Sequence, residues 1–268
     1  MTFVFPRRAP CDGEMPTHQL EMLKACETGD IGKLKGLFSA ANLSEINTAT
    51  QLGIDFIPRS GPPATSALLY SAVTHNRPEI LQFLLKTYPN ASIASDVLLG
   101  SRYANPDLPT LKVLHSHDPS IVNYGMQQTD GMDYLLLDYC RDGDPQLAGY
   151  LLDNGADPNA EEFPALNFCP LQIAINSGQP PSLINKLIEC GAKVSVMEVT
   201  YAIRKQRMDV LELVLSHCQW RAYRQSPRKK MKEVLQKARE TGNMELIALV
   251  KNQTRKAKKE MSCWQFWN

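Results

Sequence analysis

A pattern that recurs at about thirty residues is the feature that most constrains the fold of this chain. ALLYSAVTHNRPEILQFLLKTYP, residues 67–89, aligns without a gap with VLLGSRYANPDLPTLKVLHSHDP, residues 97–119, at an offset of 30. Each segment predicts a short apolar helix, a brief break and a second apolar helix, because its apolar side chains recur at the spacing of one helix face. Self-similarity at such a period is typical of solenoids, in which each unit covers the apolar face of its neighbour.

Five further segments carry the same arrangement of two apolar helices around a polar break. They are residues 23–38, 138–157, 169–193, 198–218 and 235–250. The sequence therefore predicts an all-α chain of about seven degenerate helix-turn-helix repeats over residues 17–250. We expect residues 1–16 to form an N-terminal tail and residues 251–268 to form a basic and aromatic tail or cap.

The stretch LLDNGADPNA, residues 151–160, predicts how one repeat ends. Gly155 follows an apolar helical pattern, and glycine adopts the positive φ at which helices commonly stop. Pro158 prevents the helix from resuming at once. Asp157 and Asn159 have short polar side chains that bond to nearby main-chain groups in turns. The stretch is therefore expected to be a helix exit into a tight loop.

The set of repeats resembles the ankyrin-repeat family, whose unit reads approximately TPLHxAAxxGxxEVVxLLLxxGADVNA. The matching stretches are CPLQIA at 169–174, GADPNA at 155–160 and CGA at 190–192, with Ala-x-x-x-Gly spacings at 25–29 and 238–242. The resemblance implies a solenoid with a curved concave face. No repeat has the full TPLH, whose Thr and His tie the loop to its helix in the family, so we do not expect regular finger-like hairpins.

Composition excludes several classes of protein. The chain is 43% hydrophobic, which is enough for a sizeable core, and its longest apolar run is the five residues 246–250, too short for a transmembrane helix. The first sixteen residues lack the apolar region of a secretory signal. Seven scattered cysteines without a CxxC predict reduced thiols. We expect a cytoplasmic or nuclear protein that is monomeric by itself.

The resemblance also implies which side chains face the concave surface, because in the family the positions flanking the alanine pair of each first helix point into the groove. The candidate partner-binding residues are Ser71, His75, Ser101, Asn105, Asp138, Arg141, Asp142, Asn176, Tyr201, Arg204 and Lys205. Ile173 and Ser177 share this face. The middle of the row is polar and its far end is basic.

Charge is concentrated near the end of the chain. Residues 221–260 hold 13 Lys or Arg and 4 Asp or Glu, a balance of +9, so the other residues sum to −8. Such a segment is a solvated helix face, a nuclear-import signal or an attachment to nucleic acid or acidic membrane. Trp264, Phe266 and Trp267 follow it, and they either cap the last repeat or anchor a partner.

Three other features admit chemical interpretations. His115, His117 and Asp118 offer metal ligands, although they also fit an ordinary helix end. Asp138, Arg141 and Asp142 could form an acid/base cluster with His75, or they are simply paired along a helix. The insertion at 41–65 is a passive surface loop, or else a lid or partner-binding element. We expect no metal and no cofactor, because the sequence carries no phosphate-binding or catalytic signature.

These observations predict a noncatalytic adaptor that binds a protein partner through the concave face and the basic C-terminal end. One alternative is an enzyme or ligand-binding protein with a small-molecule site in the groove. Another is a nuclear transcriptional co-regulator. Contact with a membrane is not expected, and direct contact with nucleic acid is not expected either.

Overall fold

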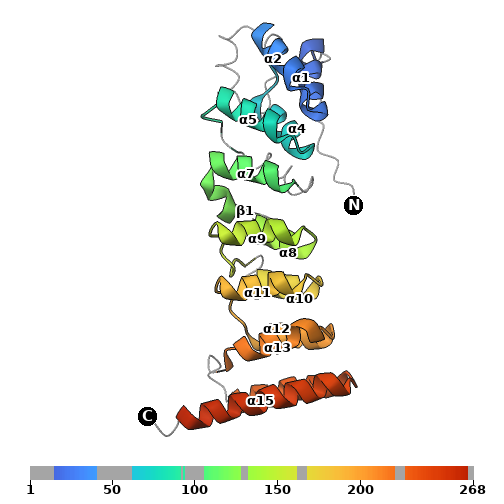
Figure 1. Cartoon of the computed structure of the whole chain (residues 1–268), viewed down its shortest axis with the longest axis vertical. Helices are drawn as coiled ribbons and strands as arrows, with labels where there is room; N and C mark the ends of the chain where they lie inside the picture. Colours follow the sequence, from blue (N-terminus) through green and yellow to red (C-terminus); the bar gives the residue numbers. More distant parts are fainter. Residues whose placement is uncertain are drawn as a thin grey trace. The chain divides into compact units, whose positions relative to one another are not determined.

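Helix pairs recur along the chain in the computed structural model, in which most of the predicted repeats are seen directly (Figure 1). The structure describes residues 15–40, 62–91, 93, 106–127, 132–161, 168–220 and 227–264. The chain divides into two units, Met1–Ile121 and Val122–Asn268. We call them the first unit and the second unit.

Among the residues that the structure describes, the helices of the first unit are α1 (Thr17–Thr28), α2 (Ile31–Ala40), α4 (Thr65–Thr74), α5 (Pro78–Thr87) and α7 (Leu108–His117). The short 3-10 helix η1 (Pro119–Asn123) follows α7 in the chain. Helix α1 packs on α2 and α4, and α5 packs on α4 and α7. Both ends of α7 lie 30 residues after the ends of α5, as the gapless alignment predicts.

The described residues of the second unit form four complete helix pairs. Their first helices are α8 (Leu135–Arg141), α10 (Pro170–Asn176), α12 (Val196–Arg204) and α14 (Pro227–Glu240). Their second helices are α9 (Pro145–Asp153), α11 (Pro181–Glu189), α13 (Met208–His217) and α15 (Met244–Trp264). First helices pack on first helices in chain order, and second helices pack on second helices in the same order. The unit is therefore two adjoining rows of helices, as the repeat prediction requires.

The core of the second unit lies between these rows and between successive pairs. Leu136, Leu151, Ala174, Leu187 and Ala202 are at most 1% exposed. A helix of seven to ten residues has little stability in water by itself. These helices are stable because each buries apolar side chains against its own partner and against the neighbouring pair.

The exit loop at residues 154–160 has the predicted form. Gly155 has a φ of +88°, and the Ala156 amide donates to the Leu151 carbonyl at 3.0 Å. The Asp157 carboxylate accepts from the Asn159 amide at 2.8 Å. The prediction of a helix exit into a tight loop is confirmed, and the residues of this loop have a structural role.

Two asparagines join successive loops of the second unit. The Asn159 side chain donates to the Gly191 carbonyl at 3.0 Å and accepts from the Lys193 amide at 2.9 Å. The Asn123 side chain makes the same two bonds one loop earlier, to the Gly155 carbonyl at 2.8 Å and from the Asp157 amide at 2.7 Å. Each asparagine therefore satisfies one main-chain acceptor and one main-chain donor of the next repeat.

A two-stranded antiparallel hairpin adds to the helical fold. Strand β1 (Gly125–Gln127) pairs with β2 (Met132–Tyr134), with Met126 opposite Asp133. Strand β2 leads directly into α8. The missing TPLH motif argued against regular hairpins, yet main-chain pairing forms this one without that motif, because strand hydrogen bonds depend little on side-chain identity.

The predicted limits of the repeat region, residues 17 and 250, can be compared with the bounds of α1 and α15. Helix α1 begins at Thr17, and α15 runs for 21 residues across the proposed boundary at residue 250. Residues 1–14, residues 41–61 of the insertion and residues 265–268, with Phe266 and Trp267, lie outside the described part of the chain. Over the described ranges, no helix combines the length and apolar character needed to span a bilayer.

We predict that Leu151→Ala destabilises the protein by about 2–5 kcal/mol, because the side chain is 0% exposed and its removal leaves a cavity. Urea unfolding followed by circular dichroism measures this loss. Leu20, which is 52% exposed, gives the matched control, since Leu20→Ala should change stability by less than about 0.5 kcal/mol. Equal effects of the two changes would show that Leu151 is not part of the core.

We also predict that Asn159→Ala lowers the free energy of unfolding by about 1–3 kcal/mol, because two main-chain groups lose their partner. The comparison is Asn176→Ala, which removes an exposed amide from a first helix and should cost less than about 0.5 kcal/mol. The same urea titration measures both. An Asn159 variant as stable as the wild type would exclude a structural role for this loop contact.

Candidate functional site

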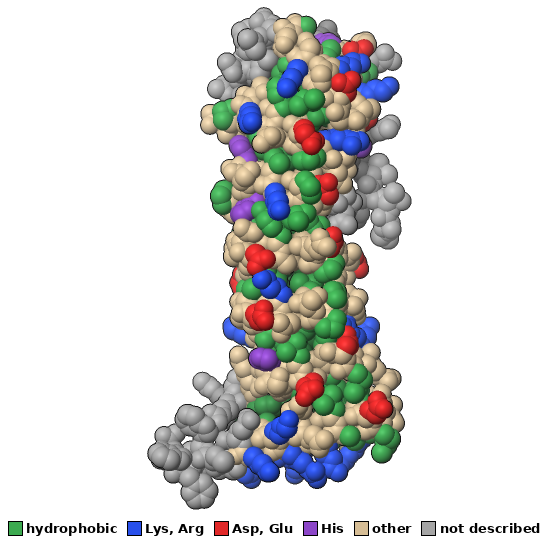
Figure 2. All heavy atoms as spheres, viewed as in Figure 1, with side chains coloured by type: hydrophobic (Ala, Val, Ile, Leu, Met, Phe, Trp, Pro, Cys, Tyr) green, Lys and Arg blue, Asp and Glu red, His purple; other side chains and the backbone are tan. Residues whose placement is uncertain are grey.

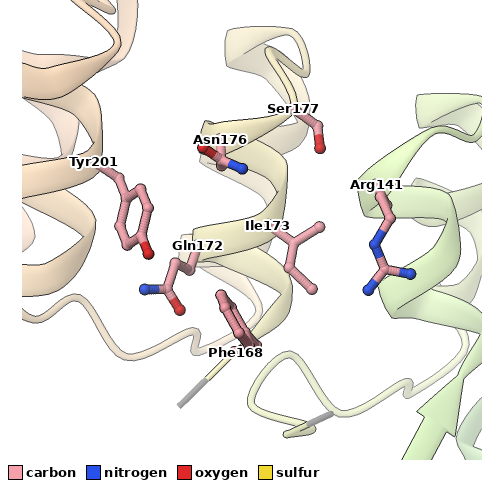
Figure 3. Close-up of a pocket in the computed structure, with 7 residues that line it drawn as sticks. All are labelled: Arg141, Phe168, Gln172, Ile173, Asn176, Ser177 and Tyr201. Atoms are coloured by element: carbon pink, nitrogen blue, oxygen red, sulfur yellow. The ribbon is translucent and has the colours of Figure 1, made fainter. Parts of the chain in front are cut away.

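A cavity of about 350 Å³ opens on the first helices of the second unit (Figure 3). Its lining comes from α8, from α10 with the residues at its two ends, and from α12. The lining residues are Arg141, Phe168, Gln172, Ile173, Asn176, Ser177 and Tyr201. Three successive repeats therefore contribute to one site.

Five of these residues lie on the face that the sequence assigns to partner binding. Arg141 ends α8, Asn176 ends α10, and Tyr201 lies in the second half of α12. Ile173 and Ser177 also lie on this face, as expected. Because the first helices pack side by side in chain order, equivalent positions of successive repeats meet at the same surface. The structure places Arg141, Asn176 and Tyr201 around one cavity, and their role in partner binding stays a prediction.

Two pairs of side chains order the polar groups of the cavity. Arg141 Nη1 lies 3.1 Å from Asp138 Oδ1, one turn earlier on α8. The two residues therefore form an ion pair along the helix, which is the simpler of the two interpretations that the sequence left open. The Arg204 guanidinium lies 5.4 Å from the centre of the Tyr201 ring, within the range of a cation–π contact. Both contacts restrict side chains that face the cavity.

The remaining predicted residues of the second unit lie beside this site. Asp142 is the exposed C-cap of α8, and Arg204 and Lys205 are exposed at the end of α12. They contribute charge around the cavity and do not line it.

Gln172 and Phe168 are cavity residues that the sequence analysis missed. Gln172 is 1% exposed, and neither of its amide atoms has a hydrogen-bond partner in the described part of the chain. In Figure 3 its amide lies near the Phe168 ring, on the side of α10 that faces Tyr201. The available signal was a polar residue within the apolar run LQIAI, at the place of the histidine in TPLH.

The predicted residues of the first unit have local structural bonds. His75 Nδ1 lies 2.9 Å from the Ser71 carbonyl, and the Ser71 hydroxyl donates to the Leu23 carbonyl at 3.5 Å. Ser101 and Asn105 lie outside the described residues. Because His75 belongs to the first unit, the cavity of the second unit does not include it, and no described lining residue is a histidine or a carboxylate. The geometry therefore gives no acid/base cluster here.

His117, at the end of α7, takes part in loop structure. His117 Nε2 lies 3.1 Å from the Ala91 carbonyl. Asp118 accepts from the Ser120 amide at 2.9 Å and from its hydroxyl at 2.7 Å, and these bonds hold the pKa of Asp118 below its ordinary value. Across the ranges that the structure describes, no three His, Cys, Asp or Glu side chains gather as metal ligands.

Two thiols belong to elements that contribute to the cavity, Cys140 in α8 and Cys169 at the N-cap of α10. The Cys169 thiol is 3.8 Å from Glu198 Oε1, and Glu198 also accepts from the Ser195 amide at 2.6 Å in a capping box. Burial, with a smaller contribution from the Glu198 carboxylate, raises the pKa of Cys169 to about 11. Burial raises the pKa of Cys140 further. Such thiols stay protonated at neutral pH, so they are packing groups and poor nucleophiles.

Comparison with known proteins finds structural likenesses of low sequence identity. No protein-family model and no curated protein sequence matches the chain. The human ASB11 ankyrin repeat domain is similar at 15% identity, covering 87% of this chain and 82% of that chain, with a TM-score of 0.44. A chain from the complex of the Bd0816 predatory endopeptidase with immunity protein Bd3460, from Bdellovibrio bacteriovorus, is similar at 17% identity. It covers 63% of this chain and 97% of that chain, with a TM-score of 0.38.

These likenesses are too low to transfer any function. The predicted all-α array of helix-turn-helix repeats is confirmed by the chain's own helix pairs, by their packing in series and by the repeated loop bonds.

We predict that alkaline pH destabilises the protein through the buried Cys140 thiol. Thiols of the unfolded chain ionise near pH 9, whereas the raised pKa keeps Cys140 protonated in the folded state. Its contribution is therefore complete below pH 9 and is lost as pH rises, at about 1.4 kcal/mol per pH unit. Urea unfolding with reductant at pH 8, 9 and 10 measures the slope. Cys140→Ala should show a smaller slope, and an unchanged slope would contradict this account.

Proposed function

We propose that the protein is a noncatalytic interaction module and that its second unit binds a protein partner along the first helices α8, α10 and α12. We call this surface the α8–α12 groove, defined by Arg141, Ile173, Asn176, Tyr201 and Arg204. The observation that carries the proposal is that three successive repeats line one cavity. A site assembled from several repeats is suited to reading an extended polypeptide.

The composition of the groove favours a protein partner. Tyrosine and arginine are the residue types that most often dominate the binding energy of protein interfaces. Tyr201 is half-buried and has the Arg204 guanidinium over its ring, so little side-chain freedom is lost when a partner covers it. Ile173 is buried and gives the cavity an apolar wall.

Exposed cations at the C-terminal end of the second unit give this module a charge preference. Figure 2 shows Lys and Arg side chains gathered over α15. The exposed cations of α14 and α15 are Arg228, Lys229, Lys232, Lys237, Arg239, Lys251, Arg255, Lys256, Lys258 and Lys259. Such a field speeds association with an acidic partner and is weakened by salt. We therefore propose a partner with acidic character near the segment that enters the groove.

Two earlier alternatives have unequal support. A small-molecule ligand is favoured by the cavity, whose volume is near the lower end for ligand pockets. A role as a nuclear co-regulator has no structural observation of its own, and cytoplasmic or nuclear location and a monomeric state remain proposals from the sequence.

We predict that a groove variant carrying Tyr201→Ala and Arg204→Glu loses the partner, because it removes the aromatic contact and reverses the adjacent charge. Capture from extracts of the source cells, with quantitative mass spectrometry, identifies proteins retained by the wild type. The control Lys193→Glu makes the same charge change on an exposed loop residue. Partners should fall in the groove variant and stay in the control.

The purified partner then gives the quantitative test. Its dissociation constant, measured by calorimetry, should rise about 30-fold or more for the groove variant, as for a hot spot of about 2 kcal/mol. It should change less than about threefold for Lys193→Glu. If every captured protein binds both variants equally, the groove is not the binding surface.

A further inference from the structure

Gln172 is part of the cavity lining, and its amide is buried there with its hydrogen-bonding capacity unused by the residues that the structure describes. Its side chain is 1% exposed, and both Nε2 and Oε1 are without a partner in the described part of the chain. Another buried glutamine in the same helix pair shows the ordinary arrangement. Gln179 is 9% exposed, and its Nε2 donates to the Tyr139 and Gly143 carbonyls at 3.3 Å each. The two glutamines differ in that only Gln172 adjoins the cavity.

An unpaired buried amide destabilises a folded chain, because its polar atoms lose water without gaining another partner. An apolar side chain such as methionine would occupy the position without that loss. The hydrogen-bonding capacity of the Gln172 amide is therefore better explained by a bound group than by the folded chain alone. A suitable bound group places one acceptor beside one donor, to match Nε2 and Oε1.

We propose that this cavity binds the side-chain carboxamide of an asparagine or glutamine in the protein partner. The proposal rests on the proposed function of the α8–α12 groove and names the group that its cavity recognises. Gln172 Nε2 donates to the carbonyl oxygen of the bound carboxamide, and Gln172 Oε1 accepts from its NH₂ group. A carboxylate has no proton to offer Oε1, and an ammonium has no acceptor for Nε2.

The walls of the cavity fit a flat, neutral group. Phe168 and Tyr201 place aromatic rings near the Gln172 amide, and Ile173 adds an aliphatic surface (Figure 3). Arg141 is paired with Asp138 at 3.1 Å, so its charge is largely compensated and does not strongly favour a carboxylate. The volume of about 350 Å³ leaves room for main chain on either side of the bound side chain.

Blocked amino acids test the chemistry directly. The probes are N-acetylglutamine and N-acetylasparagine N′-methylamides, with the glutamate and methionine analogues as controls of similar shape. Solution NMR of the full chain follows the Ile173 methyl group and the Gln172 side-chain amide. We expect a carboxamide probe to shift both signals saturably and to bind about tenfold or more tightly than the glutamate and methionine probes. Equal binding of the glutamine and glutamate probes would overturn the proposal.

Substitution of Gln172 distinguishes a role in ligand binding from a role in the stability of the fold. Gln172→Met should raise the urea midpoint and abolish the preference for carboxamide probes. Gln179→Met, the matched control, should lower the midpoint, because two carbonyls lose their donor, and should keep the preference. A lower midpoint for Gln172→Met would mean that Gln172 serves the fold. Gln172→Glu gives a second variant, in which the preference for carboxamide should also be lost.

Two further results distinguish this inference from the proposed function. If no probe prefers carboxamide while the Tyr201 and Arg204 variant still loses its partner, the inference is wrong and the groove proposal stands. Nicotinamide tests a free small-molecule amide. If nicotinamide binds more tightly than the glutamine and asparagine probes, the cavity serves a small molecule and the peptide assignment is overturned.

Discussion

The inability of one short helix pair to cover its own apolar faces is the constraint on which this structure depends. Helices of seven to ten residues gain their stability from the pairs on either side. The loops must then keep a constant spacing, and the asparagines of the second unit do this by bonding to one carbonyl and one amide of the next loop. Burial supplies the stability, and these hydrogen bonds fix the register of neighbouring repeats.

Much of this architecture could be predicted because its signals are local. The offset between residues 67–89 and 97–119 places α5 and α7 correctly, since each helix is determined by its own apolar spacing. Gly155 marks a helix end because few other residues adopt its positive φ at low cost. The groove residues Arg141, Asn176 and Tyr201 could be named because stacked repeats bring equivalent positions to one surface.

The rest depends on contacts that a linear pattern does not contain. Whether Gln172 has hydrogen-bond partners is decided by the groups that surround it in space, so its sequence position alone did not mark it. Phe168 precedes α10 and reaches the cavity through the path of the chain. Residues 251–264 of α15 were expected only as part of a tail or cap, because they are mostly polar and give no apolar stripe, although helix formers such as Lys, Arg and Ala extend a helix readily.

In the second unit, the bonds between loops and the surface of the cavity use different residues. Gly155, Asp157 and Asn159 lie in the exit loop at residues 154–160, which bonds to the neighbouring loops on both sides. Arg141 and Tyr201 lie on the first helices and contribute to the cavity surface. Substitutions on that surface change the chemistry of the groove with little effect on the loop bonds. A residue that lines the cavity with a buried amide lacking a hydrogen-bond partner among the described residues, as Gln172 does, is therefore the kind of position at which we expect binding specificity to lie.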